Sequence, residues 1–264
     1  MDLHAPDHWR TVDFISDLHL HRAEPGTYAA WQRYMQTTAA DALFILGDLF
    51  EVWVGDDVLE SASAGEPGFE AGCVGLMRQT AQRLPVFLMR GNRDFLLGEA
   101  LAASAGVRLL EDPCTLHFHS ERIVLTHGDA LCLDDTEYQN FRAVVRSPQW
   151  QSDFLAKPLA ERQAIAMDLR QRSEANKAAH ASYADVDTDA AAHWLRNAGA
   201  RTMVHGHTHQ PARHPLPDGG DRWVLSDWHI HGPHARAEVL RLSAPQTAPD
   251  AEQPQFVRIP AALR

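Results

Sequence analysis

Short segments that mix aspartate, asparagine and histidine recur along the chain, and most of them directly follow an apolar run. They are Asp17-Leu18-His19, Gly47-Asp48, Gly91-Asn92-Arg93-Asp94, Thr126-His127-Gly128-Asp129 and His205-Gly206-His207. Carboxylate and carboxamide oxygens together with imidazole nitrogens suit manganese, iron or zinc, whereas an all-oxygen set favours magnesium or calcium. Ligands of open α/β sheets bind at the carboxyl ends of the strands. The pattern therefore predicts one metal centre built from five loops.

The candidate ligands outnumber what a single tetrahedral ion needs. They are Asp17, His19, Asp48, Asn92, His127, His205 and His207. Such a set suits two metals that share a bridging carboxylate, and Asp48 is the expected bridge because its strand would be central. Two metals about 3.5–4 Å apart activate a bridging hydroxide and stabilise both oxygens of an in-line phosphoryl displacement. Any one of these residues alone would more often be structural, so the prediction depends on the ordered set.

The elements that must position these residues alternate between strands and helices. Strands are expected at 12–16, 42–46, 86–89, 107–110, 115–119, 122–126, 203–204, 222–225 and 237–242, and helices at 31–40, 74–83 and 98–105. This alternation predicts a layered α/β fold, with the hairpin and the closing strands as antiparallel additions. Residues 61–72 are expected to form a flexible excursion. The segment after Ser243 is expected to be poorly ordered, with a short strand at 256–259 as an exception.

Bulk properties exclude several classes of protein. A chain of 264 residues can form one α/β domain with an insertion or two small domains. The formal charge of −11 argues against a nucleic-acid binder, which would carry a basic surface. The three cysteines lack the spacing of a disulfide framework or a structural zinc site. Since no leader pattern and no run of about 18 apolar residues occurs, we expect a cytosolic protein.

Residues 140–180 differ in character from the rest of the chain. Apart from Pro148 and Pro158 they favour helix, with apolar residues at helical spacing. Seven basic and four acidic residues give this segment a net charge of +3 inside a chain of −11. One interpretation is an ordinary solvated pair of helices. The other is a helical cap that presents apolar and cationic groups to an amphiphilic, anionic ligand.

The ordered motifs resemble those of the calcineurin-like metallophosphoesterase superfamily, over the segment from Val12 to about Gln210. The resemblance implies a four-layer α/β/β/α sandwich of two mixed sheets with a helical cap insertion. The core would comprise residues 1–139 and 181–243, the cap 140–180, and a poorly ordered tail 244–264. In that superfamily the third motif usually reads Gly-Asn-His-Glu, and its histidine acts on the leaving group. Here Arg93 stands in place of that histidine.

Longer strings are similar to one subgroup of the superfamily, the UDP-2,3-diacylglucosamine hydrolases. These strings span 15–20, 46–57, 91–95, 126–132 and 204–211. The resemblance implies cleavage of the pyrophosphate of UDP-2,3-diacylglucosamine to UMP and 2,3-diacylglucosamine 1-phosphate in lipid A biosynthesis. It also implies two Mn²⁺ per chain that activate a hydroxide, and a peripheral location on the cytoplasmic face of a bacterial inner membrane. No nucleic-acid partner is expected, and the oligomeric state stays open, with a monomer as the expectation.

The substitution at Arg93 agrees with a diphosphate substrate. An alkoxide leaving group needs a general acid because it is a strong base, whereas a pyrophosphate expels a phosphate ester that is already a weak base. Arginine does not donate a proton near neutral pH, but its guanidinium binds phosphate oxygens in a bidentate way. The alternative for Arg93 is a structural salt bridge to Asp94 or Asp135.

The resemblance also assigns roles to individual residues. The first metal would be held by Asp17, His19, Asp48 and His207, and the second by Asp48, Asn92, His127 and His205. Catalysis would involve Asn92, Arg93, His127 and His205. Substrate contacts would come from Asn92, Arg93, Asp135 and His205, and from Ser173, Asn176 and Lys177 on the cap. The spacing from this cap motif to 185–186 is one residue shorter than in the subgroup, so Lys177 or His180 would substitute for its lysine.

Two other functions remain open from the sequence. The first is a phosphoesterase of the same chemistry that acts on a soluble dinucleotide or another nucleoside diphosphate ester, which would need no apolar cap. The second is a scaffold of this fold that has lost its metals and binds protein partners. In such a scaffold the metal-ligand residues would be the first to be replaced, whereas all seven candidate ligands are present in this chain.

Overall fold

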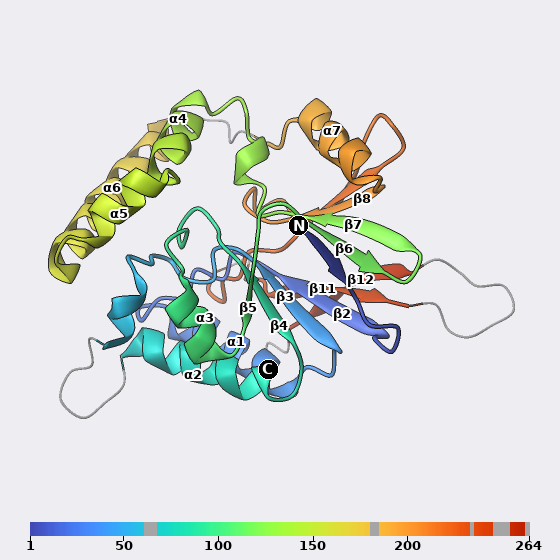
Figure 1. The fold of residues 1–264 in the computed structure, drawn as a ribbon, viewed down its shortest axis with the longest axis horizontal. Coiled ribbons are helices and arrows are strands. Elements are labelled where there is room, and N and C mark those ends of the chain that lie inside the picture. The colour runs from blue at the N-terminus through green and yellow to red at the C-terminus, as the bar shows by residue number, and fades with distance from the viewer. Residues whose placement is uncertain (61–67, 180–184, 233–234, 245–253, 262–264) are drawn as a thin grey trace, which may run out of the picture.

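Two six-stranded mixed sheets form the centre of the protein in a computed structural model (Figure 1). The structure describes residues 1–60, 68–179, 185–232, 235–244 and 254–261, without the side chains of 172–179. The first sheet contains, in spatial order, β1 (Asp2–His4), β6 (Cys114–Phe118), β7 (Glu121–Leu125), β8 (Thr202–His205), β10 (Asp221–Val224) and β9 (Arg213–Pro215). The second contains β12 (Gln255–Pro260), β11 (Glu238–Ser243), β2 (Thr11–Ile15), β3 (Ala42–Leu46), β4 (Val86–Met89) and β5 (Arg108–Leu110).

The layers follow from which faces of the sheets are apolar. Every residue of β3 is buried, because one face meets the other sheet and the opposite face meets helices. Phe44 and Phe87 stack between the sheets with ring centroids 4.8 Å apart. Helices α1 (Pro25–Thr37), α2 (Phe69–Ala81) and α3 (Glu99–Ala105) cover the outer face of the second sheet, and α7 (Thr188–Ala198) covers the first. The expected four-layer α/β/β/α sandwich is confirmed.

The strands that precede the metal-type segments end at one edge of the sandwich. β2, β3 and β4 are parallel, with Ile15 opposite Ile45 and Leu46 opposite Met89. In the other sheet β7 and β8 are parallel, with Leu125 opposite Val204. Parallel neighbours in register end side by side, so the loops that follow these five strands are brought together.

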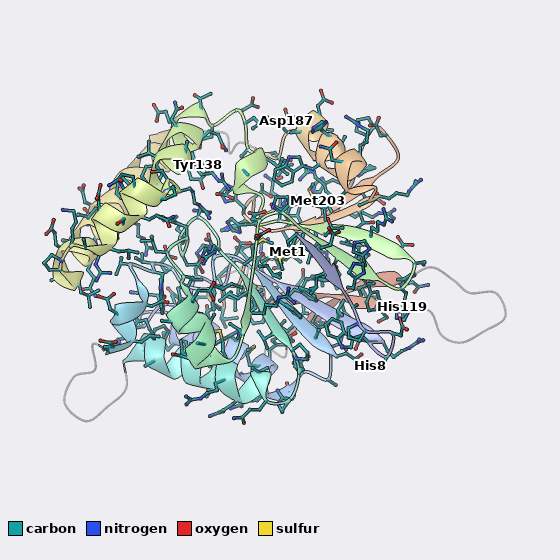
Figure 2. The ribbon with its side chains drawn as sticks, in the orientation of Figure 1. Met1, His8, His119, Tyr138, Asp187 and Met203 are labelled. Carbon is teal, nitrogen blue, oxygen red and sulfur yellow. The ribbon has the colours of Figure 1, made fainter. Side chains whose placement is uncertain are left out.

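Three helices form an insertion beside this edge: α4 (Thr136–Val145), α5 (Pro148–Leu155) and α6 (Leu159–Ala179), hereafter the cap (Figure 1). The side chains of Asp135 and Ser147 accept hydrogen bonds from the backbone N–H groups of Tyr138 and Trp150, which fixes the starts of α4 and α5. In Figure 2, Tyr138 on α4 and His119 at the β6–β7 turn lie on opposite sides of the molecule. None of the helices described is both long and apolar enough to cross a bilayer.

Some expected boundaries differ from the structure. The short strand expected at 256–259 within the tail is confirmed and is one residue longer at each end, because β12 pairs with β11 along its whole length and completes the second sheet. Residues 69–72 belong to α2 rather than to an excursion. The remaining parts of these two predictions, 61–67, 245–253 and 262–264, lie outside the described residues. The three-residue strands β1 and β9 are too short to show a pattern in the sequence.

Candidate metal centre

The loops of the centre bend in an unusual way after their strands. Asp17, His19, Asp48, His207 and His209 have φ angles of 53°, 48°, 52°, 67° and 54°. Residues other than glycine rarely adopt such left-handed conformations, which cost of order 1–3 kcal/mol each and cluster at functional sites. The backbone therefore accepts strain at the residues whose side chains form the centre.

Asp94 ties two of these loops together. Its buried carboxylate accepts hydrogen bonds from the backbone N–H of Gly91 at 2.7 Å, of Leu49 at 2.8 Å and of Asp48 at 3.3 Å. A Cβ atom on Gly91 would collide with the Asp48 carboxylate, so only glycine permits this approach of the two loops. Asp94 thus fixes where Asp48 and the Asn92 loop lie relative to each other.

Asp48, Asn92, His127 and His207 converge on one side of the centre. The Oδ1 atom of Asn92 lies 2.9 Å from His127 Nε2 and 2.8 Å from His207 Nδ1. Asp48 Oδ1 lies 3.7 Å from His127 Nε2. The other ring nitrogen of His127 donates to the carbonyl oxygen of Leu46 at 2.9 Å, which leaves Nε2 as the nitrogen that faces the centre.

Asp17, His19 and His209 converge on the other side. His209 Nε2 lies 3.3 Å from Asp17 Oδ1 and 3.4 Å from His19 Nε2. Ligand-type atoms of Asp17, His19 and His209 all lie within 4.8 Å of one another, and so do those of Asp17, Asp48 and His127. The two groups overlap at Asp17, whereas Asp48, the bridge expected from the sequence, belongs to the second group and lies 3.9 Å from His19 of the first.

The charges of the centre fit a cation. Burial opposes protonation of His127, but the carboxylates of Asp48, Asp17 and Asp129 outweigh it and raise the pKa of His127 to about 9. Positive charge is therefore favoured at this buried position. Because carboxylate, carboxamide and imidazole donors are combined, the set suits divalent ions of the manganese-to-zinc type.

His205 lies apart from these groups, although the sequence assigned it as a ligand. It is the last residue of β8, its Nδ1 atom is 2.9 Å from the Gly206 carbonyl oxygen, and its Nε2 atom is 3.4 Å from Arg222 Nη1. Burial lowers the pKa of His205 to about 4. The geometry places His209, not His205, beside Asp17. The sequence signal for His209 is the Gly-His-x-His spacing of 206–209, in which the glycine precedes both histidines that lie at the centre.

Arg93 lies at the rim of the centre. Its Nη1 atom is 3.8 Å from Glu51 Oε1, and its backbone N–H donates to Asp48 Oδ1 at 2.8 Å. The partner of its side chain is therefore Glu51, rather than the Asp94 or Asp135 considered from the sequence. Glu51 also lies 3.4 Å from His19 Nδ1. Sequence reasoning gave Glu51 no role, since a glutamate three residues after Asp48 has no distinctive pattern.

The predicted substrate contacts are only partly described. Asp135 is exposed and caps α4 through its hydrogen bond from Tyr138 N–H at 3.0 Å. Ser173, Asn176 and Lys177 lie on α6, and their side chains fall outside the described part of the structure.

Arginines attach the cap to the ligand loops. Arg142 Nε donates to the buried carboxylate of Asp129 at 2.8 Å, and Tyr138 Oη donates to the same carboxylate at 2.5 Å. Arg146 Nη2 donates to the carbonyl oxygen of Gly91 at 2.9 Å. Since Asp129 follows His127 by two residues and Gly91 precedes Asn92, α4 contacts both loops that supply ligands on one side of the centre.

Helix α6 is linked to the core by the loop after Asp48. Arg162 is almost fully buried, donates from Nη1 to Asp57 Oδ1 at 2.9 Å, and also contacts the carbonyl oxygen of Val54. Arg170 Nη1 lies 3.0 Å from Glu51 Oε1. These arginines therefore hold the helices 136–179 to the core.

Removing the carboxylate of Asp94 is expected to damage the centre without removing a ligand. In Asp94→Ala the buried N–H groups of Gly91, Asp48 and Leu49 lose their acceptor, so the free energy of unfolding should fall by about 3 kcal/mol or more. Metal affinity should fall by about 10- to 100-fold, as for other supports of ligands. Denaturant unfolding and metal titration check both values. Asp153→Ala on exposed α5 serves as the control, and equal behaviour of the two variants would contradict this role.

Comparisons with known proteins extend the sequence resemblance. The chain matches the calcineurin-like phosphoesterase family over residues 10–211, which include every ligand candidate. A Chromobacterium violaceum protein named UDP-2,3-diacylglucosamine hydrolase is 48% identical over 225 residues, covering 83% of this chain and 90% of that protein. A Bordetella pertussis protein of the same name is 48% identical over 219 residues, which cover 81% of this chain and 83% of that protein. A solved archaeal phosphodiesterase aligns over 94% of this chain and 99% of its own, at 11% identity and a TM-score of 0.44.

Proposed function

We propose a reaction for this chain from one premise: it belongs to the calcineurin-like phosphoesterase family and, within it, to the UDP-2,3-diacylglucosamine hydrolases. The reaction is hydrolysis of the pyrophosphate of UDP-2,3-diacylglucosamine to UMP and 2,3-diacylglucosamine 1-phosphate, a step of lipid A biosynthesis. The observation that carries it is the convergence of carboxylate, carboxamide and imidazole groups from five loops beside a cap.

Two Mn²⁺ ions are the proposed cofactors. Asp17, His19, Asp48 and His209 would hold the first ion, and Asp48, Asn92, His127 and His207 the second. When bound, such a pair lowers the pKa of water and neutralises charge on the reacting phosphate. The chain itself orients the ligands: Leu46 fixes the ring of His127, and Asp94 fixes the loop of Asp48.

Arg93 is proposed to bind the pyrophosphate rather than to act as an acid. Its guanidinium stands at the rim of the centre beside Glu51, and a bidentate contact to phosphate oxygens neutralises the charge that develops on the departing phosphate. Asn92 would contact the same phosphate. Asp135, Ser173, Asn176 and Lys177 remain proposed contacts to the sugar headgroup from the cap side, whereas His205 is proposed to support the strand end.

Replacing Arg93 by alanine should therefore lower kcat/KM by about 10²–10³-fold, the range for loss of one preorganised charge contact. Arg93→Lys should recover only a small part of this loss, because an ammonium group does not form the bidentate contact. Steady-state kinetics on the diacylated substrate provide the measurement, with Arg108→Ala on the exposed end of β5 as the control. Full activity of Arg93→Lys would rule out bidentate binding.

The surface of the cap supports a diacylated substrate and a location at the bilayer surface. Exposed large apolar side chains among the described residues include five within or just before the cap: Leu133, Phe141, Val144, Leu155 and Met167. An apolar surface beside a polar centre suits a lipid whose phosphates react while its chains stay out of water. We propose a monomer that binds peripherally to the cytoplasmic face of the bacterial inner membrane.

Binding to vesicles should depend on this apolar surface. Val144→Ser combined with Met167→Ser removes two side chains that are 55% and 61% exposed, and should weaken binding to phosphatidylglycerol vesicles by about tenfold or more. Val257→Ser, on β12, removes a side chain that is 50% exposed and lies away from the cap, and should leave binding unchanged. Co-sedimentation measures both. Equal loss in the two variants would contradict docking through the cap.

The alternative is a phosphoesterase of the same chemistry with a soluble nucleoside diphosphate ester or dinucleotide as substrate. UDP-2,3-diacylglucosamine and the same compound without its acyl chains separate the two functions. The proposed function predicts a kcat/KM at least about 100-fold higher for the acylated compound, since each buried CH₂ contributes about 0.8 kcal/mol. Equal values for the two compounds would favour the alternative.

A further inference from the structure

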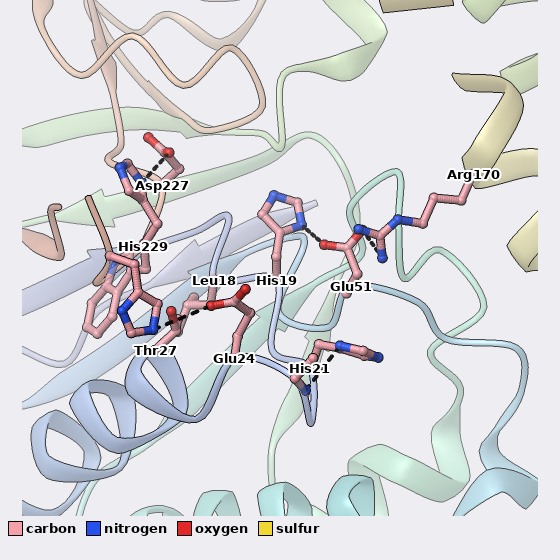
Figure 3. A pocket seen from close by; sticks show the side chains of 12 residues that line it. Leu18, His19, His21, Glu24, Thr27, Glu51, Arg170, Asp227 and His229 are labelled. Carbon is pink, nitrogen blue, oxygen red and sulfur yellow. Dashed lines mark hydrogen bonds and ion pairs between the residues drawn. The ribbon is translucent and has the colours of Figure 1, made fainter. Parts of the chain in front are cut away.

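A cavity lined largely by polar residues lies directly beside the metal centre. Its volume is about 520 Å³, within the usual range of small-molecule sites. Its walls come from the β2–α1 loop with the first turn of α1, from Glu51 and Arg170, and from the segment 227–231 (Figure 3). Nine of its twelve lining residues are polar or charged, and the apolar ones are Leu18, Ala23 and Trp228.

The cavity opens from the His19 side of the centre. His19 belongs to both the centre and the cavity wall, and Asp227 Oδ2 lies 3.8 Å from His209 Nδ1. Asn92, Arg93 and His127 do not line it, and Arg170 alone comes from the cap. A substrate that reacts at the centre with its sugar beneath the cap would therefore direct the other half of the molecule into this cavity.

The walls carry groups that match a nucleoside. Glu24 and Asp227 can accept hydrogen bonds from ribose hydroxyls, and each carboxylate lies near an imidazole, His231 at 3.9 Å and His229 at 3.2 Å. α1 begins at Pro25, and Glu24 makes no side-chain cap hydrogen bond to it. N–H groups in the first turn of a helix have no acceptor within the helix and can donate to the carbonyl oxygens of a base.

Trp228 adds a second observation at the same place. Its side chain lines the cavity and is only 3% exposed, yet its Nε1 atom has no hydrogen-bond partner among the described residues. A buried N–H without an acceptor costs about 1–3 kcal/mol, which a bound ligand with a carbonyl or hydroxyl oxygen can offset. We infer that this cavity binds the uridine end of the substrate and retains it as UMP after hydrolysis. The inference rests on the proposed function.

The test removes a carboxylate and an imidazole from the cavity wall without touching a metal ligand. Glu24→Gln combined with His231→Ala should raise the inhibition constant of UMP by about tenfold and raise KM for the full substrate. Inhibition by the lipid product and the manganese content should stay within twofold. Ligand-observed NMR with uridine, recorded without metal, should show the same loss of binding. Asp2→Asn with His117→Ala, a carboxylate–imidazole pair at 2.8 Å on the first sheet, is the matched control.

The outcomes separate the two claims. If the wild-type protein supplied with manganese releases no UMP, the proposed function is contradicted. If it releases UMP but the double variant keeps its UMP inhibition constant and its uridine signal, the cavity does not bind the nucleoside. The inference would also be overturned if the double variant lost inhibition by the lipid product to the same extent as inhibition by UMP. The substitutions would then act on the centre as a whole and not on the cavity.

Discussion

Replacing Asp48 by alanine is expected to lower kcat by about 10³-fold or more and to remove at least one bound metal ion. Asp48 is buried, its backbone is held in a left-handed conformation by Asp94, and its carboxylate faces both His127 and His19. A metal ion contributes several kcal/mol of transition-state stabilisation, and each 1.36 kcal/mol is tenfold in rate. Steady-state kinetics of the purified variant give its kcat, and elemental analysis gives its metal content.

Asp41 offers a matched control on the same strand. It directly precedes β3, at the end opposite to Asp48, and its carboxylate accepts backbone hydrogen bonds from Arg10 at 2.7 Å and Thr11 at 2.8 Å. Asp41→Ala should lower stability but keep the metal content and most of the kcat. An Asp48→Ala protein that retains two metals would contradict the bridging role. A wild-type protein without bound metal would instead favour a non-catalytic scaffold.

The second large effect is a contrast between two histidines four residues apart. His209→Ala should lose about 10²–10³-fold in kcat and most of the affinity for one metal ion, because His209 lies beside Asp17 and His19. His205→Gln should keep both metals and lower the melting temperature, because His205 is buried against Gly206 and Arg222.

Metal titration and thermal unfolding of the two variants separate the assignments. If the His205→Gln protein lost a metal ion and the His209→Ala protein kept both, the ligand set expected from the sequence, with His205, would be supported. The control is His193→Ala on the exposed side of α7, where the ring shares a hydrogen bond with Asn197 at 2.9 Å.

Most of the centre could be predicted from the chain because its ligands follow strands. Asp17, Asp48, Asn92 and His127 each come after a buried apolar run, and parallel strands in register end at one edge of a sheet. The different positions of His205 in the sequence-based ligand set and in the structure have a simple cause. Residues two apart share a face of a strand, so His205 and His207 appear equivalent, whereas β8 ends at His205 and the chain then turns at Gly206.

What the sequence could not show depends on contacts between distant segments. Glu51 joins His19, Arg93 and Arg170 across more than a hundred residues, and Arg146 donates to the carbonyl oxygen of Gly91, 55 residues earlier in the chain. Pairs of this kind have no spacing rule. The strand β12 was uncertain for the same reason: its alternating residues become a strand only because β11 supplies an edge to pair with.

The most direct test of the proposed function is product identification from UDP-2,3-diacylglucosamine by ³¹P NMR, with and without manganese. The ligand set of the centre and the relatives of the chain predict two new phosphomonoester signals, UMP and 2,3-diacylglucosamine 1-phosphate, formed in equal amounts only when the metal is supplied. An intact pyrophosphate after prolonged incubation with manganese, or cleavage at the same rate in the presence of a strong chelator, would contradict the account.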